Sequence, residues 1–403
     1  MIHPLYHNKG IELRSDKLIG IITLQNSNNY GAMYQVYALS KYLESLGHEV
    51  FVLDYEMTRD KPSLAYYLRH AISVLQKVHH RKMFSLSYFK RSKQLGLANK
   101  REKTFGEIFE NFRKQYLKIT NEQYDYKKLE GNCPKADAYI CGSDQVWAAD
   151  FLFTSPAFLL GFVPGNIRKI AYAPSFGKNQ LEPYLRYTFN KFLKKFDAIS
   201  VREKKGLDIV KSVAGQQAIQ VLDPTLLLNK EDYVEIIDYS LVPNKPYIFV
   251  YRLGQEELLS NWVTETINEI SLTKKLPIHV VSTNSASSFG EAWVEMTPTP
   301  GQLLGLIEKS SMTLTNSFHG TVFAIILKAE FLSFARDSFE DKQNVRMTDL
   351  LSTLGIPSLY CPPFTNFERV IEKLNDSNCP DETLDRLREL KQVSGAFLKD
   401  ALG

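Results

Sequence analysis

The sequence predicts an α/β fold with two Rossmann-like domains that face a cleft. Three observations lead to this fold class. The chain has 403 residues, which favours two domains over one large core. Short apolar runs alternate with segments of helical periodicity, as they do in parallel α/β sheets. The alternation forms two series, and between them residues 229–245 show weaker periodicity, with Pro243 and Pro246 at the far end.

The first series opens with a strand, a polar loop and a helix. Residues 18–24 form a short apolar run rich in β-branched side chains, which is typical of a buried strand. Residues 31–46 carry apolar side chains at helical spacing, and Gly47 is a plausible stop. The remaining elements expected in this series are strands at residues 49–54, 138–141, 169–173, 198–201 and 219–222, and a helix over residues 204–213.

The second series repeats the pattern. We expect strands at residues 247–251, 278–282, 312–315 and 331–334, and helices near residues 256–270, 301–309, 320–328 and 345–354. These boundaries predict an N-terminal domain over residues 1–235 and a C-terminal domain over residues 236–378. Residues 379–403 are expected to form a helix that packs back on the first domain. In such sheets, ligands bind beyond the carboxyl ends of the strands.

A basic segment interrupts the first series. Residues 69–103 contain ten Lys or Arg residues and one acid, Glu102, with aromatic side chains between them. We expect a helical insertion near residues 60–120. It either rests on an anionic membrane surface close to a lipid-linked acceptor or presents an ordinary solvated face.

Composition excludes several classes of protein. The net charge of +4 does not indicate a nucleic-acid binder. No two of the four cysteines have CxxC spacing, so zinc, dithiol and iron–sulfur sites are not expected. The cysteines form either four free thiols or two distant pairs. Without a secretory signal or an apolar run of membrane-spanning length, we expect a cytoplasmic protein, peripheral at the inner membrane face if the basic segment binds there.

Four loops at strand ends carry the candidate functional residues. In the first, Asn29, Tyr30 and Gly31 precede or begin a helix, where backbone amides favour an anion, although asparagine also serves as a plain helix cap. In the second, Ser143 and Asp144 follow a strand. Asp144 is a candidate base or acceptor for a sugar hydroxyl, and the alternative is that it caps the next turn.

The third and fourth loops add charged groups. Arg202 ends a strand, where its guanidinium suits a carboxylate or phosphate, and the alternative is a surface pair with Glu203. In the fourth loop, a buried strand turns directly into an apolar helix at residues 314–321. His319 lies at that helix N-terminus, between the candidate anion donors Ser317, Gly320 and Thr321.

Taken together, these loops resemble the polysaccharide pyruvyl transferase family. The motifs that carry the resemblance occur in the family's order between about residues 17 and 354. Gly142-Ser143-Asp144-Gln145-Val146-Trp147 is the most specific of them. The other motifs are residues 29–39, 171–177, 200–203, 222–225 and 317–321. Tyr34 stands where leucine is usual and Ala148 where asparagine is frequent, and both departures concern contacts to the acceptor.

The resemblance implies a fold similar to the GT-B glycosyltransferases. It also implies phosphoenolpyruvate as the donor, with no metal and no further cofactor. The acceptor it implies is a sugar in a surface-polysaccharide precursor, such as a capsule or exopolysaccharide unit. Two alternatives remain open: a glycosyltransferase that uses a nucleotide sugar, and a non-catalytic carbohydrate-binding component.

By this resemblance, Arg202 and His319 hold the donor near the reacting centre, and Asn29, Asp144 and Asp223 match more weakly. We expect His319 to act as an acid–base group or as a cationic phosphate clamp. Alanine at either Arg202 or His319 is expected to remove turnover and leave the fold intact.

The reaction also needs a base for each sugar hydroxyl and further positive charge for the donor. Asp144 and Glu203 are the candidate bases. Lys342 and Arg346 are the candidate additional cations, and the alternative is that both are exposed to solvent. The acceptor sugar, the ketal stereochemistry and the oligomeric state are not specified by the sequence.

Overall fold

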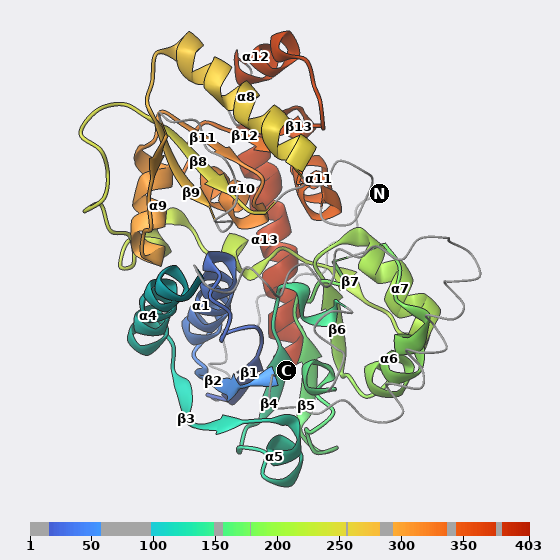
Figure 1. The fold of residues 1–403 in the computed structure, drawn as a ribbon. Coiled ribbons are helices and arrows are strands. Elements are labelled where there is room, and N and C mark those ends of the chain that lie inside the picture. Colours follow the sequence, from blue (N-terminus) through green and yellow to red (C-terminus); the bar gives the residue numbers. More distant parts are fainter. Residues whose placement is uncertain are drawn as a thin grey trace, which may run out of the picture.

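The structure is a computed structural model of two stacked lobes (Figure 1), each with a parallel sheet. It describes residues 16–57, 98–148, 156–177, 179–254, 257–282, 293–336, 344–375 and 381–403. Most of the basic segment at residues 69–103 therefore lies outside the described residues. Its last residues belong to helix α4 (Ala98–Tyr116), which packs beside α1 (Tyr30–Ser45).

The first lobe contains a seven-stranded parallel sheet with the order β3-β2-β1-β4-β5-β6-β7. Its strands are β1 (Leu18–Ile22), β2 (Glu49–Tyr55), β3 (Ile119–Tyr124), β4 (Ala138–Cys141), β5 (Arg168–Ala171), β6 (Ala198–Val201) and β7 (Ile219–Gln220). Besides α1 and α4, its α-helices are α5 (Tyr126–Gly131), α6 (Arg186–Leu193) and α7 (Lys204–Ala214).

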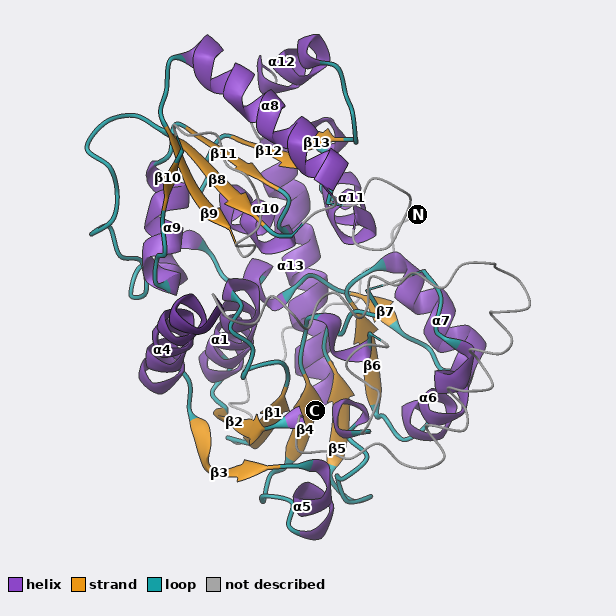
Figure 2. Cartoon of the chain, viewed as in Figure 1, coloured by secondary structure: helices purple, strands orange, loops and turns teal. Residues whose placement is uncertain are grey.

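The second lobe contains a six-stranded parallel sheet with the order β10-β9-β8-β11-β12-β13. Its strands are β8 (Ile248–Arg252), β9 (Ile278–Ser282), β10 (Val294–Glu295), β11 (Met312–Thr315), β12 (Phe331–Phe334) and β13 (Tyr360–Cys361). Its helices are α8 (Glu257–Lys274), α9 (Pro300–Lys309), α10 (Phe318–Ile326), α11 (Asn344–Thr353) and α12 (Phe367–Asn375). Figure 2 shows helices on both faces of this sheet. The α/β class with two Rossmann-like sheets is confirmed.

In each sheet the order of the strands along the chain changes direction at one point, between β1 and β4 and between β8 and β11. Ligands of such sheets bind at this point. The chain moves outward from β1 and then returns to place β4 on its other side, and β8 and β11 repeat this arrangement. A crevice opens beyond the carboxyl ends of the strands at such a switch point. The loops after β4 and β11 begin with Gly142 and Asn316, so the motifs around Asp144 and His319 lie at the two switch points.

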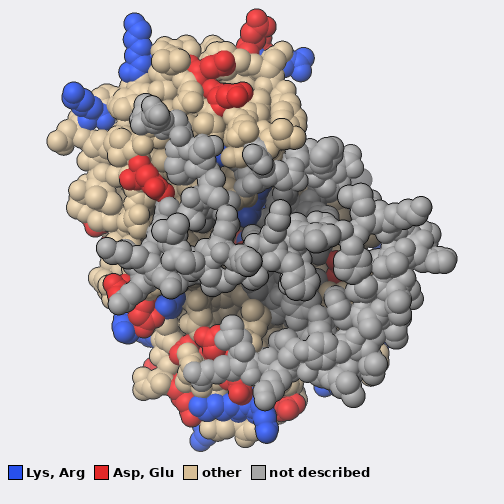
Figure 3. All heavy atoms as spheres, in the orientation of Figure 1, with Lys and Arg blue, Asp and Glu red and all other residues tan. Residues whose placement is uncertain are grey.

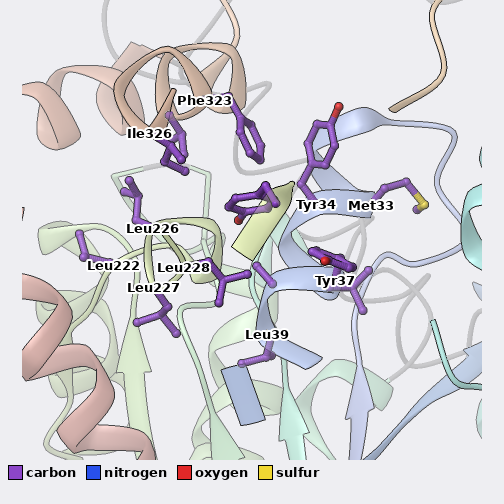
Figure 4. Packing of buried hydrophobic residues seen from close by; sticks show 14 of the residues in the cluster. Met33, Tyr34, Tyr37, Leu39, Leu222, Leu226, Leu227, Leu228, Phe323 and Ile326 are labelled. Carbon is purple, nitrogen blue, oxygen red and sulfur yellow. The ribbon is translucent and has the colours of Figure 1, made fainter. Parts of the chain in front are cut away.

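The two lobes share one continuous apolar core (Figure 4). Tyr34 of α1 packs edge-on against Phe323 of α10, with ring centroids 4.5 Å apart. The buried hydroxyl of Tyr34 donates to the carbonyl of Pro300 at 2.6 Å, and Tyr30 donates to Pro298 at the same distance. These contacts hold α1 against the second lobe, so Tyr34 joins the domains.

The terminal helix α13 (Asp381–Leu402) runs along both lobes (Figure 1). The hydroxyl of Ser394 accepts a hydrogen bond from the Leu222 amide at 2.9 Å. Near the end of the helix, Arg168 Nη1 donates to the Ala401 carbonyl at 2.9 Å. No helix in the described part of the chain is long and apolar enough to cross a membrane.

On the face shown in Figure 3, acidic and basic side chains are interspersed over the described surface, and a basic side chain lies deep between the lobes. Cys133, Cys141 and Cys361 are free thiols, as one of the two interpretations of the sequence expected. Cys379 lies outside the described residues.

Candidate functional site

Asp223 follows β7, and its carboxylate is the point where loops of both domains meet. The residue is 2% exposed. Its Oδ2 accepts from Arg202 Nη1 at 2.7 Å, and Ser143 Oγ lies 3.1 Å from the same oxygen. Its Oδ1 accepts from the backbone N–H of Thr225 at 3.1 Å and from the hydroxyl of Thr225 at 2.6 Å. His319 Nε2, from the other domain, lies 3.6 Å from Oδ2. Protein groups thus surround both carboxylate oxygens.

Arg202 lies at the end of β6 with three carboxylates around its guanidinium. Besides Asp223, Glu203 Oε1 accepts from its Nε at 3.1 Å, and Asp144 Oδ1 lies 3.7 Å from its Nη2. Arg202 and Glu203 are each 6% exposed, so their interpretation as a surface pair is wrong. Nη2 has no hydrogen-bond acceptor in the described part of the chain, so both of its N–H groups are left for a ligand.

The charges of this cluster reinforce one another. Burial alone would lower the pKa of Arg202, but Glu203, Asp223 and Asp144 together raise it above its usual value. Burial alone would raise the pKa of Asp223, but His319, Arg202 and Thr225 hold it well below its usual range. Both groups are therefore charged at neutral pH.

His319 lies in the first turn of α10. Ser317 caps this helix, and its Oγ accepts from the Gly320 amide at 3.2 Å. Just before the cap, Thr315 Oγ1 donates to the Tyr251 carbonyl at 2.8 Å and ties the turn to β8. The His319 ring is 7% exposed, and its Nε2 has no hydrogen-bond partner among the described residues at ordinary distance.

Gly31 of α1 makes room for the His319 ring. A Cβ atom built at Gly31 would collide with His319 Nδ1, so the backbone of the first domain supports the imidazole of the second. The sequence led us to expect that Gly31 contacts the substrate, whereas the structure places it directly against the His319 ring.

The variant Gly31→Ala is expected to displace His319 and reduce turnover by about 10²-fold, since displacements near 1 Å at a reacting group have effects of that size. The matched control is Gly131→Ala, because a Cβ atom there would meet no heavy atom within 4 Å. Steady-state kinetics of both variants provide the measurement. Wild-type turnover in Gly31→Ala would contradict the positioning role.

Phe318 separates two arginines. The guanidinium carbon of Arg202 lies 4.5 Å from the centroid of its ring, and that of Arg346 lies 6.0 Å from it. Arg346, on α11, is 8% exposed. Burial and the charge of Arg202 lower the pKa of Arg346 to about 10, which leaves it charged at neutral pH. Both arginines line a cavity of ≈ 70 Å³ together with Glu203, Asp223 and Phe318.

Asp144 has an unusual backbone. Its φ is 74° and its ψ is −173°, a region that is essentially reserved for glycine. A non-glycine residue there stores about 1–3 kcal/mol of strain. The interpretation of Asp144 as a cap is wrong, because its side chain makes no capping hydrogen bond to the turn at Gln145–Trp147.

The fourth loop departs from the sequence prediction in one respect. Helix α10 begins at Phe318 and not at Gly320, so the amides of Gly320 and Thr321 already bond Ser317 Oγ and the Ser317 carbonyl. These two amides therefore do not face an anion as expected. The amides of Phe318 and His319 precede them and have no acceptor in the described ranges. The Thr321 hydroxyl is fully buried beside Ser333 Oγ, 2.6 Å away.

Two further residues from the sequence analysis lie apart from this cluster. Asn29 caps α1, and its Oδ1 accepts from the Ala32 amide at 3.2 Å. Tyr30 is buried between the domains. Lys342 lies outside the described residues. The residues that the fold does bring together are Ser143, Asp144, Arg202, Glu203, Asp223, Ser317, His319 and Arg346.

Sequence reasoning did not assign roles to Phe318, Tyr251 or Asp349. Asp349 Oδ2 accepts from the Lys204 amide at 3.1 Å and from Gln220 Nε2 at 2.9 Å, which gives a further connection between the domains. Phe318 belongs to the motif at residues 317–321 that carries the family resemblance, so the sequence did indicate that it lies near the site. The contacts of Asp349 depend on how the domains dock, and no sequence pattern indicates them.

The cluster combines fixed cations with carboxylates in a largely buried site. Such an arrangement can bind an anion and move protons at a bound ligand. No group of three or more His, Cys, Asp or Glu residues that could hold a metal occurs within the described ranges.

Comparison with solved structures supports the fold. UDP-GlcNAc 2-epimerase from Methanocaldococcus jannaschii is similar with a TM-score of 0.52 at 11% identity, over 91% of this chain and 95% of that chain. S. aureus MnaA, solved with UDP, is similar with a TM-score of 0.50 at 11% identity, over 93% and 91% of the two chains. At this identity the likeness concerns the fold alone, which is the expected GT-B-like arrangement.

The sequence itself gives the more specific result. No curated protein matches it significantly. The family model for polysaccharide pyruvyl transferases matches residues 29–338, which is most of the chain and includes every residue of the cluster except Arg346. The chain therefore belongs to the polysaccharide pyruvyl transferase family, as its motifs had indicated.

Proposed function

We propose that the protein transfers pyruvate from phosphoenolpyruvate to two hydroxyl groups of one sugar, forming a cyclic ketal and releasing phosphate. This reaction needs cations for the donor's carboxylate and phosphate, a proton for its methylene carbon and a base for each hydroxyl. The observation that carries the proposal is the pair of buried guanidinium groups on Phe318, next to His319. Membership of the family supports the reaction class.

The donor's negative charges are assigned to three groups. Arg346 and Nη2 of Arg202 supply guanidinium donors, and the first amides of α10 add the positive end of a helix dipole. Arg202 already neutralises three carboxylates, so Arg346 carries the larger share of anion binding. This differs from the sequence prediction, in which Arg202 was the principal clamp.

The proton for the methylene carbon is assigned to His319. Asp223 Oδ2 lies 3.6 Å from its Nε2, so the carboxylate helps to fix the orientation of the ring. Asp223 itself is enclosed by protein donors, so it positions Arg202 and His319 and does not contact the substrate. No metal and no cofactor other than the donor takes part in the proposed reaction.

The acceptor is proposed to be a sugar unit of a surface-polysaccharide precursor, such as a capsule or exopolysaccharide repeat. If that precursor is lipid-linked, the reaction takes place at the cytoplasmic face of the inner membrane. The basic segment at residues 69–103 would then provide the membrane contact. This part of the proposal rests on sequence alone, because the segment lies mostly outside the described residues.

Donor binding can be measured without knowing the acceptor. Phosphoenolpyruvate is expected to raise the Tm of the wild-type protein, and the variant Arg346→Gln is expected to lose most of this shift because it lacks a buried cation. Arg346→Lys keeps the charge and is expected to retain part of the shift. Circular dichroism checks that each variant is folded. An equal shift in wild type and Arg346→Gln would contradict the assignment of Arg346.

The principal alternative is transfer of a hexose from a nucleotide sugar. The two-domain fold permits it, because structures of similar fold include enzymes named for UDP-GlcNAc. A nucleotide sugar would then raise the Tm, and phosphoenolpyruvate would not. A non-catalytic carbohydrate-binding protein would show neither effect and would bind sugar alone.

A further inference from the structure

The fold of the loop after β4 does not require an aspartate at position 144. A glycine would adopt φ 74° and ψ −173° without strain. The residue stands at the switch point beyond β4, where ligands of such sheets bind. Strained residues cluster at functional sites, where the surrounding structure holds them in place. The strain at this position is therefore a cost of having the aspartate side chain there.

The surroundings fix this backbone from both sides. The carbonyl of Asp144 accepts from the Ser175 amide at 2.8 Å, and the Trp147 amide donates to the Ser175 carbonyl at 3.2 Å. The Trp147 ring is fully buried, and its Nε1 donates to the Phe158 carbonyl at 3.0 Å. The loop thus has a fixed shape, and the direction of the Asp144 side chain follows from it.

Among the three carboxylates around Arg202, Asp144 has the most accepting capacity left. Asp223 is enclosed by donors, and Glu203 accepts from Arg202 Nε at 3.1 Å. Asp144 makes only the 3.7 Å ion pair with Arg202 Nη2, and its side chain has the largest exposed fraction of the three at 14%. In the described part of the chain, no hydrogen-bond donor lies within ordinary distance of its carboxylate.

We propose that Asp144 is the base that accepts the proton of the attacking sugar hydroxyl, and that its strained backbone holds the carboxylate at that position. The inference rests on the proposed function, and it names the residue that acts on the acceptor sugar in the same site. It separates two candidates that the sequence left equal, because Glu203 already accepts a hydrogen bond from Arg202 Nε and is less exposed than Asp144.

The double-bond electron pair of the donor takes the proton of His319, which turns the methylene into a methyl group. The sugar oxygen then bonds to the neighbouring carbon, and its proton passes to the Asp144 carboxylate. A second hydroxyl of the same sugar bonds to that carbon, the bond from carbon to the phosphate oxygen breaks, and the proton of this hydroxyl passes to the departing phosphate. The products are a pyruvate ketal and phosphate.

The proposal predicts opposite effects of one substitution on stability and activity. Asp144→Gly relieves the backbone strain and is expected to raise the Tm by a few degrees, while turnover falls by about 10²–10⁴-fold. Asp144→Asn keeps the strain and is expected to lose similar activity without the gain in Tm. Both variants should still show the Tm shift with phosphoenolpyruvate, because the donor cations are unchanged.

A matched control tests whether strain relief alone affects turnover. Lys275, exposed between α8 and β9, also has a positive φ, of 54°. Lys275→Gly is expected to change the Tm slightly and leave turnover at the wild-type level. Formate added to Asp144→Gly is expected to restore part of the lost turnover, since it supplies a carboxylate in the space that the side chain leaves. It should not restore turnover in His319→Ala.

Wild-type turnover in Asp144→Asn or Asp144→Gly would overturn the proposal, and so would a lower Tm for Asp144→Gly than for the wild type. Failure of the proposed function has a different signature. In that case the wild-type protein itself shows no Tm shift with phosphoenolpyruvate and releases no phosphate with any acceptor, and the role of Asp144 as a base in this reaction falls with it.

Discussion

The variant Arg202→Ala is expected to lose about 3–5 kcal/mol of folding free energy in addition to its turnover, because it leaves buried carboxylates without their cation. Asp223 would keep His319 and Thr225 as neighbours, whereas Glu203 would lose its bond to Nε. The sequence alone suggested that alanine at Arg202 would leave the fold intact. The burial of the ion pairs changes that expectation.

The stability of Arg202→Ala is also expected to depend on pH in the opposite direction from the wild type. The pKa of Asp223 is lowered in the wild-type fold, so its contribution is complete above the unfolded pKa of about 3.9 and is lost as the pH falls below that value. Without Arg202, one of the groups that lower the pKa of Asp223 is gone and burial shifts that pKa upward, so protonation of Asp223 relieves an unpaired buried charge. The variant should therefore gain stability as the pH is lowered from 8 to about 5.

Urea unfolding at several pH values measures both effects. Arg388→Ala is the matched control, because Arg388 pairs with Asp385 at 2.7 Å on the surface, with side chains 69% and 67% exposed. Removing that pair should change stability by less than about 1 kcal/mol. If Arg202→Ala behaved like Arg388→Ala, the buried ion-pair network would not stabilise the fold as argued above.

The second large effect is expected for His319→Ala. Turnover should fall by about 10²–10⁴-fold, the range for loss of a general acid. The fold should be retained, because the imidazole makes one long contact to Asp223 and no short hydrogen bond from Nε2 within the described residues. Gln at the same position keeps some of the shape without a transferable proton, so it should be equally inactive.

His319→Lys separates the two roles that the sequence left open. Lysine restores a positive charge, so a phosphate clamp would recover donor binding and much of the turnover. A proton donor would recover binding but not turnover, which is the result that we expect. His279→Gln is the control, because His279 lies near the start of β9, at the edge opposite the carboxyl ends of the strands. Full turnover in His319→Gln would contradict the acid role.

The sequence predicted the core strands well because their signal is local. The strands at residues 138–141, 198–201, 278–282, 312–315 and 331–334 have the predicted boundaries. The missed strands β3, β10 and β13 lie at or next to sheet edges, and the Ile119–Tyr124 strand is largely polar and partly exposed. Such a strand is defined by its partner and not by an apolar run.

The candidate site was predictable in its loops but not in its pairings. That Arg202 and His319 approach one anion site follows from strand ends and family motifs. The ion pair between Asp223 and the guanidinium of Arg202 follows only from the packing of β6 beside β7 and the docking of the second domain. Tyr34 shows the same limit: it appeared as a departure near the acceptor, whereas its hydroxyl bonds Pro300 across the domain interface.

The most direct test of the proposed reaction is phosphate release from phosphoenolpyruvate in the presence of a panel of β-galactosides and N-acetylhexosaminides. Mass spectrometry would follow each sugar in parallel. We expect phosphate release that requires the acceptor, with a product heavier than the sugar by pyruvic acid less water, and neither signal in His319→Ala. Hexose transfer from a nucleotide sugar, with no phosphate released from phosphoenolpyruvate by the wild-type protein, would contradict the proposed function.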